Sequence, residues 1–336
     1  MTAAPPPLLS VVDLRVHFPV GGGLFGLRPR GLVRAVDGVD LDLAQGQTTG
    51  LVGESGSGKS TLGRAILQLH EPHVARLSGQ VLYGGRDLVA LGRTRAGQRT
   101  LRPLRRELQI VFQDPYASLN PRMNVAALVG EGLRVHGIAR GAEAARRVDA
   151  LLDLVGLSPA MARRYPHEFS GGQRQRIGIA RALAVGPRLL VCDEPVSALD
   201  VSIQAQIINL LSDLQAQLGL TILFIAHDLA AVKHVSERLA VMFHGRLVEL
   251  GAAAEVYGAP RHPYTQALIR AAPVPCPRIA RAQRPALLAG ELPSPLAAPV
   301  GCAFQSRCPV AIARCRTDAP PLREVAPDHR VACHLA

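Results

Sequence analysis

The sequence has little that would suit a nucleic-acid-binding or membrane-spanning protein. It contains no tryptophan, and aromatic residues make up 4% of the chain, which leaves few side chains to stack on bases. No uncharged apolar run reaches the roughly 18 residues that cross a bilayer. The uncharged stretch 292–306 is interrupted by three prolines and predicts a loop, and the first residues lack a basic leader and a cleavage site. We therefore expect no nucleic-acid partner, no secretory signal and a cytoplasmic protein.

The chain also has fewer acidic than basic residues: it contains 26 Asp and Glu and 38 Lys and Arg, which gives a net charge of +12. Arginine carries nearly all of this charge and clusters at residues 102–106, 146–147 and 163–164. Such clusters usually form solvated faces, although they also suit the anionic inner face of a membrane. Hydrophobic residues make up 48% of the 336 residues, enough for one large domain with an appendage.

A glycine-rich segment at residues 53–61, GESGSGKST, fits the phosphate-binding pattern G-x-x-x-x-G-K-[ST]. Glycines permit the tight turns that bring main-chain N–H groups to a phosphate, and a helix expected over 59–68 directs its N-terminus at the same anion. The apolar stretch 48–52 ahead of the loop suits a buried strand. The pattern predicts nucleotide contacts from Gly53, Ser55, Gly56, Gly58, Lys59, Ser60 and Thr61.

An acidic pair, Asp193 and Glu194, follows the apolar run 189–192. An acid at the carboxyl end of a parallel strand lies where open α/β sheets bind ligands. Behind a phosphate loop, this position predicts that Ser60 and Asp193 hold Mg²⁺ and that Glu194 polarises the attacking water. Lys59 would then supply positive charge to the outer phosphates.

A second helix start suited to an anion occurs at Ser170, Gly171, Gly172 and Gln173, ahead of a helix expected over 173–185. A simple helix cap is one interpretation of this segment. The chain already has a complete phosphate loop, so the residues alone do not require a second one.

Together with the sequence SALD that follows the acidic pair, these motifs resemble the ATP-binding cassette (ABC) proteins. Their signature LSGGQ is FSGGQ here, with Phe169 in place of leucine. The resemblance implies that Gln113 senses Mg²⁺ and the water, and that His227 contacts the γ-phosphate. It also implies that residues 170–173 close over ATP held by a partner's phosphate loop, in a head-to-tail dimer.

Two further nucleotide contacts follow from the same resemblance. Asp200 ends the SALD loop and is expected at the nucleotide. Cassette proteins often stack adenine on an aromatic residue near the N-terminus, for which Phe18 is the candidate and His17 the alternative. A phenylalanine of the core or its rim is nearly as good an interpretation of Phe18.

Two longer stretches, QDPYASLNPRM at 113–123 and RHPYTQALIRAAP at 261–273, resemble the ATPases of oligopeptide and dipeptide importers. With the glycine- and arginine-containing opening, they are most similar to the second, F-type, of two paired ATPases, over roughly residues 8–334. Importers of nickel and of glutathione share these stretches, so those cargoes are alternatives. A soluble cassette ATPase of DNA repair or translation is a weaker alternative, because the chain has one cassette and no sustained heptads.

An importer ATPase implies several partners. They are a paralogous ATPase subunit or a second copy of this chain, two transmembrane permease subunits, and indirectly a substrate-binding protein. The resemblance therefore places the protein at the cytoplasmic face of the inner membrane, as a peripheral subunit.

The expected fold class is α/β, with a P-loop NTPase core built on a RecA-like sheet and an antiparallel β region at the N-terminus. The nucleotide-binding domain is expected over residues 8–250, and a helical subdomain with the signature is inserted at 113–180. Within that insert, the apolar spacing of Val148, Leu151, Leu152 and Val155 predicts a helical stripe. A C-terminal extension with a cysteine site is expected over 251–336.

Four of the six cysteines lie in this extension, at Cys302, Cys308, Cys315 and Cys333, with the spacing C-x5-C-x6-C-x17-C. Four thiolates suit Zn²⁺ or an iron–sulfur cluster, although the C-x2-C pair usual for zinc is missing. The resemblance to peptide importers implies a [4Fe–4S] cluster, and unligated thiols are the remaining alternative. His334 is a substitute ligand for a zinc site, whereas Cys192 and Cys276 are interpreted as non-ligands.

Overall fold

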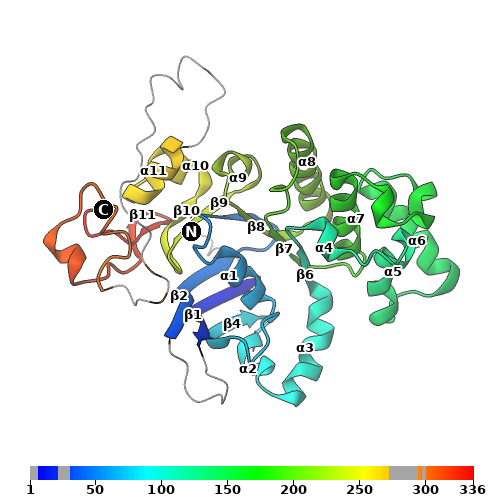
Figure 1. Ribbon diagram of the computed structural model, residues 1–336, viewed down its shortest axis with the longest axis horizontal. Helices are drawn as coiled ribbons and strands as arrows, with labels where there is room; N and C mark the ends of the chain where they lie inside the picture. Colours follow the sequence, from blue (N-terminus) through cyan, green and yellow to red (C-terminus); the bar gives the residue numbers. More distant parts are fainter. Residues whose placement is uncertain (1–6, 22–30, 272–293, 295, 297–299) are drawn as a thin grey trace.

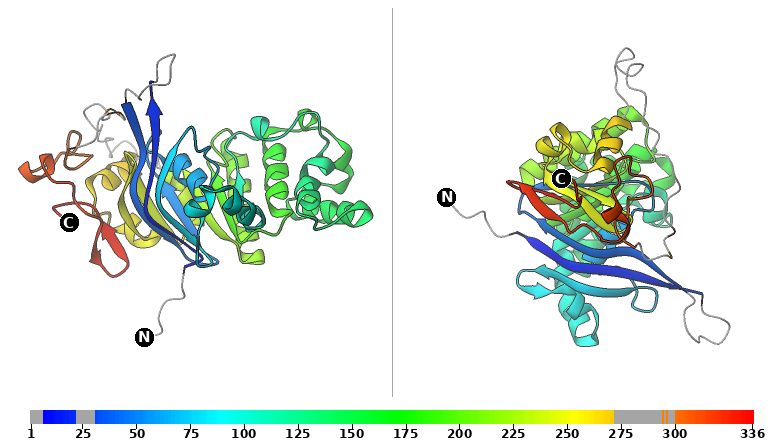
Figure 2. Two further views of the ribbon diagram at one scale, coloured as in Figure 1. Left: turned by 90° about the horizontal axis from the view of Figure 1, so that it is seen from below. Right: turned by 90° about the vertical axis from the view of Figure 1, so that its left-hand side faces the viewer.

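The computed structural model describes residues 7–21, 31–271, 294, 296 and 300–336. It contains two β-sheets, one of four strands and one of eight, with helices around them. The cysteine-containing extension and the helical insert lie at opposite ends of the long axis, with the four-stranded sheet between them (Figures 1 and 2). The predicted α/β class is confirmed.

The N-terminal sheet is antiparallel, as predicted, in the order β2-β1-β4-β5. Buried and exposed residues alternate along parts of its strands, since one face packs on the protein and the other meets solvent. Its strands are β1 (Leu9–Val20), β2 (Gly31–Leu43), β4 (Arg76–Tyr83) and β5 (Arg86–Asp87). The sheet covers one face of the nucleotide-binding core.

The larger sheet has the order β11-β12-β10-β9-β3-β8-β7-β6, and its five strands from β9 to β6 are parallel. Its central strands are buried throughout, as expected for parallel strands covered on both faces. The strands are β3 (Thr48–Val52), β6 (Leu108–Val111), β7 (Leu189–Asp193), β8 (Thr221–Ala226), β9 (Arg238–Phe243), β10 (Arg246–Ala252), β11 (Arg323–Ala326) and β12 (His329–Val331). Strands β3 and β7 coincide with the apolar runs predicted at 48–52 and 189–192.

Two hydrophobic cores lie on the two faces of the larger sheet. Neighbouring residues of β3 divide between them, because Leu51 faces the core under the N-terminal sheet and Val52 faces the core under the later helices. The helices around the sheet are α1 (Lys59–Ile66), α2 (Leu88–Gly92), α3 (Arg95–Glu107), α8 (Val201–Leu218), α9 (Leu229–Val235), α10 (Ala253–Gly258) and α11 (Pro263–Ala271).

The predicted insert is helical and projects away from the sheets (Figure 1). In the predicted stripe, Val148, Leu152 and Val155 are buried, and Leu151 packs against the same core. The elements of the insert are α4 (Pro115–Ser118), α5 (Val125–Val135), α6 (Gly141–Leu154), the 3-10 helices Pro159–Arg163 and Pro166–Glu168, and α7 (Gly171–Leu183).

The C-terminal extension is built into the larger sheet, because β12 pairs with β10 and β11 with β12. Glu249 of β10 is fully buried and accepts hydrogen bonds from the main-chain N–H groups of Arg261 and His262. Its carboxylate also lies 2.7 Å from Nε2 of His329 in β12. The predicted division at residue 250 therefore falls inside β10.

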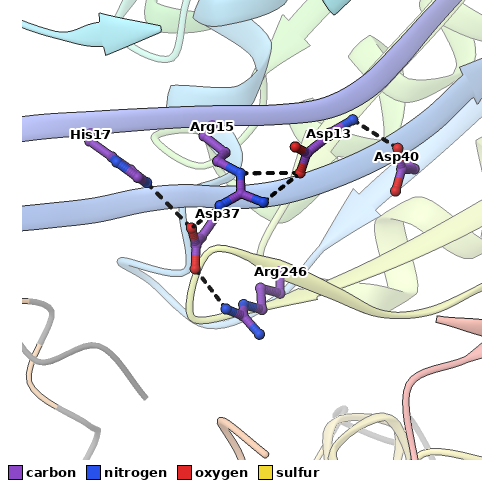
Figure 3. A network of polar contacts seen from close by, with 6 residues as sticks. All are labelled: Asp13, Arg15, His17, Asp37, Asp40 and Arg246. Carbon is purple, nitrogen blue, oxygen red and sulfur yellow. Dashed lines mark hydrogen bonds and ion pairs between the residues drawn. The ribbon is translucent and has the colours of Figure 1, made fainter. Parts of the chain in front are cut away.

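Figure 3 shows a polar network that joins the two sheets around Asp37 of β2. The buried Asp37 carboxylate accepts a hydrogen bond from Arg246 of β10 at 2.8 Å and lies 3.3 Å from Nε2 of His17 in β1. Burial acts to raise the pKa of Asp37, but the hydrogen bond and charge of Arg246, aided by His17, outweigh it and lower the pKa. The remaining members shown are Asp13, Arg15 and Asp40.

Burial of His262, in the segment before α11, predicts a pH dependence of stability. Burial lowers the pKa of His262 from 6.5 to about 4, and Nδ1 accepts the N–H of Tyr264 at 3.0 Å. Between these values the unfolded chain binds a proton that the folded chain does not, so stability falls as the pH drops. The loss reaches up to about 3 kcal/mol, at about 1.4 kcal/mol per pKa unit.

His262→Asn keeps an acceptor near Nδ1 and does not titrate. We expect the stability advantage of the wild type over H262N to shrink as the pH falls from about 7 to about 4.5, in urea unfolding series. Parallel curves for the two proteins would contradict the assignment.

Candidate functional site

The phosphate loop, residues 53–58, lies between β3 and α1 and packs closely on other strands. Gly58 has a φ of 103°, and a Cβ there would lie 2.0 Å from the carbonyl oxygen of Ala35 in β2. At Gly53 a Cβ would lie 2.1 Å from the carbonyl oxygen of Met242 in β9. Both positions require glycine, because main-chain atoms have no room to withdraw.

Lys59, the first residue of α1, is only 4% exposed. Its Nζ donates hydrogen bonds to the carbonyl oxygens of Gly53 at 2.8 Å and Glu54 at 2.9 Å. Burial lowers the pKa of Lys59, while the charges of Glu194, Asp193 and Glu54 oppose that shift. A cation held among carboxylates inside an anion-binding loop is well placed for the outer phosphates of a nucleotide.

The side chains of Ser60, in α1, and Asp193, the last residue of β7, contact each other. The Ser60 hydroxyl donates to Oδ1 of Asp193 at 2.5 Å, and Arg64 of α1 lies 3.5 Å from Oδ2 of the same carboxylate. The Asp193 side chain is 1% exposed. A hydroxyl and a carboxylate are the oxygen donors that Mg²⁺ prefers.

Glu194 contacts the two other residues to which the family resemblance gives catalytic roles, Gln113 and His227. Oε2 of its carboxylate accepts a hydrogen bond from Nε2 of Gln113 at 3.0 Å, and Nδ1 of His227 lies 3.3 Å away. Gln113 follows β6 and His227 follows β8, so three strand ends converge on one carboxylate. Glu194 has a φ of 46°, an uncommon conformation for a residue other than glycine, which places strain at this point of the site.

The signature residues cap α7, which begins two residues earlier than predicted, at Gly171. Oγ of Ser170 accepts the N–H of Gln173 at 3.3 Å, and Oε1 of Gln173 accepts the N–H of Ser170 at 3.1 Å. This capping box explains the early start, because it satisfies the first N–H groups of the helix. Gly172 lies against Ile203 of α8 with no room for a Cβ, and Phe169 is buried.

The remaining predicted nucleotide contacts are Asp200, Phe18 and its alternative His17. Asp200 is the residue before α8 and makes no side-chain hydrogen bond that caps the helix. The Phe18 ring is half-buried and contacts His70 edge-on, with centroids 5.6 Å apart. His17 instead pairs with Asp37, as drawn in Figure 3. The stacking role of Phe18 therefore remains a prediction.

The four cysteines of the extension share one neighbourhood and form no disulfide among themselves. The N–H of Cys302 donates to the carbonyl oxygen of Cys315 at 2.8 Å. Burial raises the pKa of the Cys302 thiol, and the thiols of Cys315, Cys308 and Cys333 act in the same direction.

These thiols lie near one another, but they are not arranged to bind a metal ion. Among residues 7–21, 31–271, 294, 296 and 300–336, no group of three or more His, Cys, Asp or Glu side chains is arranged to hold a metal ion. Nε2 of His334 pairs with the carbonyl oxygen of Asp318. Cys192 is fully buried in β7, and Cys276 lies outside the described residues.

The sequence did not predict that Glu54, Tyr264 and Arg307 lie together at the phosphate loop. The main-chain N–H of Glu54 donates to the Tyr264 hydroxyl at 2.8 Å, and the Glu54 carboxylate pairs with Arg307. Tyr264 and Arg307 belong to the C-terminal extension, more than two hundred positions away in the sequence. Only the folding of the extension onto the core brings them to the loop.

The packing at Gly58 predicts the effect of a single added methyl group. Gly58→Ala should lower ATP affinity by more than about tenfold, the loss of roughly one charge-assisted hydrogen bond, because Ala35 forces the loop to move. Titration with a fluorescent ATP analogue measures this change. Gly219→Ala is the matched control, since Gly219 also has a positive φ (63°) but no atom within 4 Å of the added Cβ; equal affinity losses in both variants would contradict the prediction.

Two known families match the chain. The family "ABC transporter" matches residues 36–197, and "Oligopeptide/dipeptide transporter, C-terminal region" matches residues 248–315. The first match contains the phosphate loop, the signature and the acidic pair. The second contains Tyr264, Arg307 and the first three cysteines of the tail.

Similar proteins match over almost their whole length. The chain is 49% identical to "Oligopeptide transport ATP-binding protein AppF" of Bacillus subtilis (strain 168), covering 100% of this chain and 99% of that protein. It is 50% identical to "Oligopeptide transport ATP-binding protein OppF" of Salmonella typhimurium, covering 97% and 95%.

Solved structures of other cassettes have the same fold. CbiO1 from Clostridium perfringens, part of the ABC transporter complex cbiONQ, has a TM-score of 0.61 and 28% identity, covering 76% of this chain and 92% of that one. The ATP-binding cassette MJ0796, in a dimeric structure bound to ADP and Pi, has a TM-score of 0.62 and 26% identity, covering 73% and 98%.

No helix in the part of the chain that the structure describes is long and apolar enough to cross a membrane.

The converging strand ends, the phosphate loop and these matches agree on one conclusion. The chain belongs to the ABC transporter family as an ATPase subunit, in the group that carries the oligopeptide/dipeptide transporter C-terminal region.

Proposed function

We propose that this chain hydrolyses ATP to drive the uptake of peptides through partner permeases. The observation that carries the proposal is the Glu194 carboxylate between Gln113 and His227, next to the Ser60–Asp193 pair. The names of the similar proteins support oligopeptides as cargo over the alternatives of nickel and glutathione.

In this proposal ATP lies on the phosphate loop with Lys59 at its outer phosphates. Glu194 accepts a proton from water, and the resulting hydroxide forms a bond to the γ-phosphorus. The bond from that phosphorus to the bridging oxygen breaks, so ADP and phosphate leave. Gln113 would orient the water, and His227 would contact the γ-phosphate.

The oxygen donors of Ser60, Asp193 and Gln113 fit Mg²⁺ in their chemistry. When bound, the ion would neutralise charge that develops on the phosphate oxygens. The buried Asp193 carboxylate and the Ser60 hydroxyl would hold it, and Gln113 would approach it from the end of β6.

Ser170, Gly171, Gly172 and Gln173 would contact ATP that is held by the phosphate loop of a partner subunit. Asp200 would also contact the nucleotide. Ser170 and Gln173 hydrogen-bond to each other within the first turn of α7, and both contacts are exposed. The signature therefore lies at the surface of the helical insert. The dimeric MJ0796 cassette structures among the structural relatives support a pair of subunits, and the head-to-tail arrangement rests on the family resemblance. A paralogous, F-type pairing fits the family, with a homodimer as the alternative.

In this assembly, each segment of the chain would have a separate role. Residues 8–250 would form the nucleotide-binding domain, residues 113–180 would dock the two permeases, and residues 251–336 would form the extension. A substrate-binding protein would contribute indirectly, and the ATPase would act at the cytoplasmic face of the inner membrane. Adenine would stack on Phe18, whose ring is half-buried at the edge of the core.

We further propose that Cys302, Cys308, Cys315 and Cys333 bind a [4Fe–4S] cluster, with Zn²⁺ as the alternative. The support is chemical: four thiols lie near one another without a disulfide, and thiolates are the ligands of such clusters. Binding would require the thiols to draw together from their present arrangement.

Glu194→Gln tests the hydrolytic role. We expect steady-state hydrolysis to fall by about 10²–10⁴-fold, the usual contribution of a general base, while ATP binding is retained because the amide has the same shape. Phosphate release by the assembled transporter measures the rate, and Glu255→Gln, an exposed acid of α10, is the control. Retained turnover in E194Q would sink the role assigned to Glu194.

Metal analysis after anaerobic purification tests the cysteine site. We expect about four irons with matching sulfide per chain, lost in Cys308→Ser and retained in the control Cys276→Ser. Stoichiometric zinc, or no metal at all, would contradict the cluster.

A further inference from the structure

We propose that Tyr264 and Arg307 of the C-terminal extension are positioning residues for ATP binding, because together they hold Glu54 of the phosphate loop. We call these three residues the Glu54 clamp. The inference rests on ATP binding at the phosphate loop and adds a role for the extension in that same site.

The clamp grips both the main chain and the side chain of Glu54. Its N–H donates to the Tyr264 hydroxyl at 2.8 Å. Its carboxylate receives two parallel hydrogen bonds from Arg307, Nη1 to Oε2 at 2.7 Å and Nη2 to Oε1 at 3.0 Å. A forked, charge-assisted pair of this kind fixes direction as well as distance. The Arg307 side chain is 9% exposed and the Glu54 side chain 26%, so the pair is partly shielded from solvent.

Tyr264 is itself held rigidly, which makes it a fixed point for the loop. It is fully buried, and its ring lies 4.7 Å from Phe243 and 5.4 Å from Phe304, between centroids. Phe243 ends β9, the strand whose Met242 carbonyl also limits the loop at Gly53. The hydroxyl therefore has a defined position relative to the sheet.

Arg307 is positioned by the cysteine-bearing segment 302–308. Phe304 is 1% exposed and anchors the segment in the core, and its carbonyl oxygen accepts the N–H of Arg307 at 3.1 Å. Cys302 is joined to Cys315 through main-chain atoms, and Cys308 follows Arg307 directly. The conformation of the cysteine tail thus sets where the guanidinium of Arg307 lies.

The clamp also controls charge at the phosphate site. Glu54 is one of three carboxylates whose charge acts on Lys59, and its carbonyl oxygen accepts a hydrogen bond from Nζ of that lysine. Arg307 neutralises the Glu54 carboxylate. Without Arg307, a free negative charge next to the loop would repel the phosphates and compete with them for Lys59.

A double-mutant cycle on the full chain separates positioning from simple anchoring of the extension. The variants are Arg307→Gln, Glu54→Gln and their combination, with Asp328→Asn as matched control. Asp328 makes a forked pair with Arg238 at 2.6 and 2.8 Å, which also ties the extension to β9 but touches no residue of the phosphate loop. The readouts are the Kd for a fluorescent ATP analogue and the Tm.

We expect R307Q to raise the Kd about tenfold, the equivalent of one charge-assisted hydrogen bond. Glu54→Gln in the same chain should recover the part of that loss that comes from the unpaired charge, and the part that is not recovered measures the lost positioning. D328N should leave the Kd unchanged, although it weakens the attachment of the extension. Tyr264→Phe, which keeps the ring and removes only the acceptor for the Glu54 N–H, should also raise the Kd without loss of the folded state.

Wild-type affinity in both R307Q and Y264F would overturn the inference, as would equal losses in R307Q and D328N. Failure of the wild-type chain to bind the analogue would instead contradict ATP binding itself. The two failures are therefore distinguishable in one set of titrations.

Discussion

Parallel pairing of β3 with β8 and of β8 with β7 aligns the carboxyl ends of these strands, and the rest of the site depends on this alignment. The phosphate loop leaves β3, Asp193 and Glu194 leave β7, and His227 leaves β8. A shift of one residue in either pairing would reverse the faces of the side chains and separate Ser60 from Asp193. Burial of these strands on both faces makes such a shift costly.

The same buried sheet explains why the site concentrates opposing charges. Lys59 is enclosed beside Asp193, Glu194 and Glu54, where weak screening strengthens every interaction. The Lys59 ammonium also donates hydrogen bonds to main-chain oxygens of the loop itself. In the proposed mechanism a nucleotide would add negative charge at this point, and the buried ammonium of Lys59 would receive it.

The C-terminal extension is a structural part of this core. Its strand β12 continues the larger sheet, Glu249 and His329 pair across the junction, and Phe304 lies among Phe243 and Tyr264. The elements that carry the cysteines therefore reach the phosphate loop through packed, buried contacts. The proposed role of the extension in ATP binding rests on this continuity of buried contacts.

The local sequence determined the elements of the catalytic core, because the residue types within each motif indicate the local structure that the motif forms. The glycines of the phosphate loop, the apolar run before Asp193 and the stripe on α6 predict a loop, a buried strand and a helix from neighbouring residues alone. The family resemblance then assigned Gln113 and His227 to one site, and their contacts with Glu194 agree with that assignment.

Only the tertiary structure decided which distant side chains support the site. Tyr264 and Arg307 meet Glu54 across more than two hundred positions, at a loop position that the phosphate-binding pattern leaves free. The tertiary structure also decided that His17 contacts Asp37. It brought the four thiols close together, but not in an arrangement that holds a metal ion. The reason is that a motif constrains residues whose spacing is set by the chain, whereas these contacts are set by the packing of separate elements against one another.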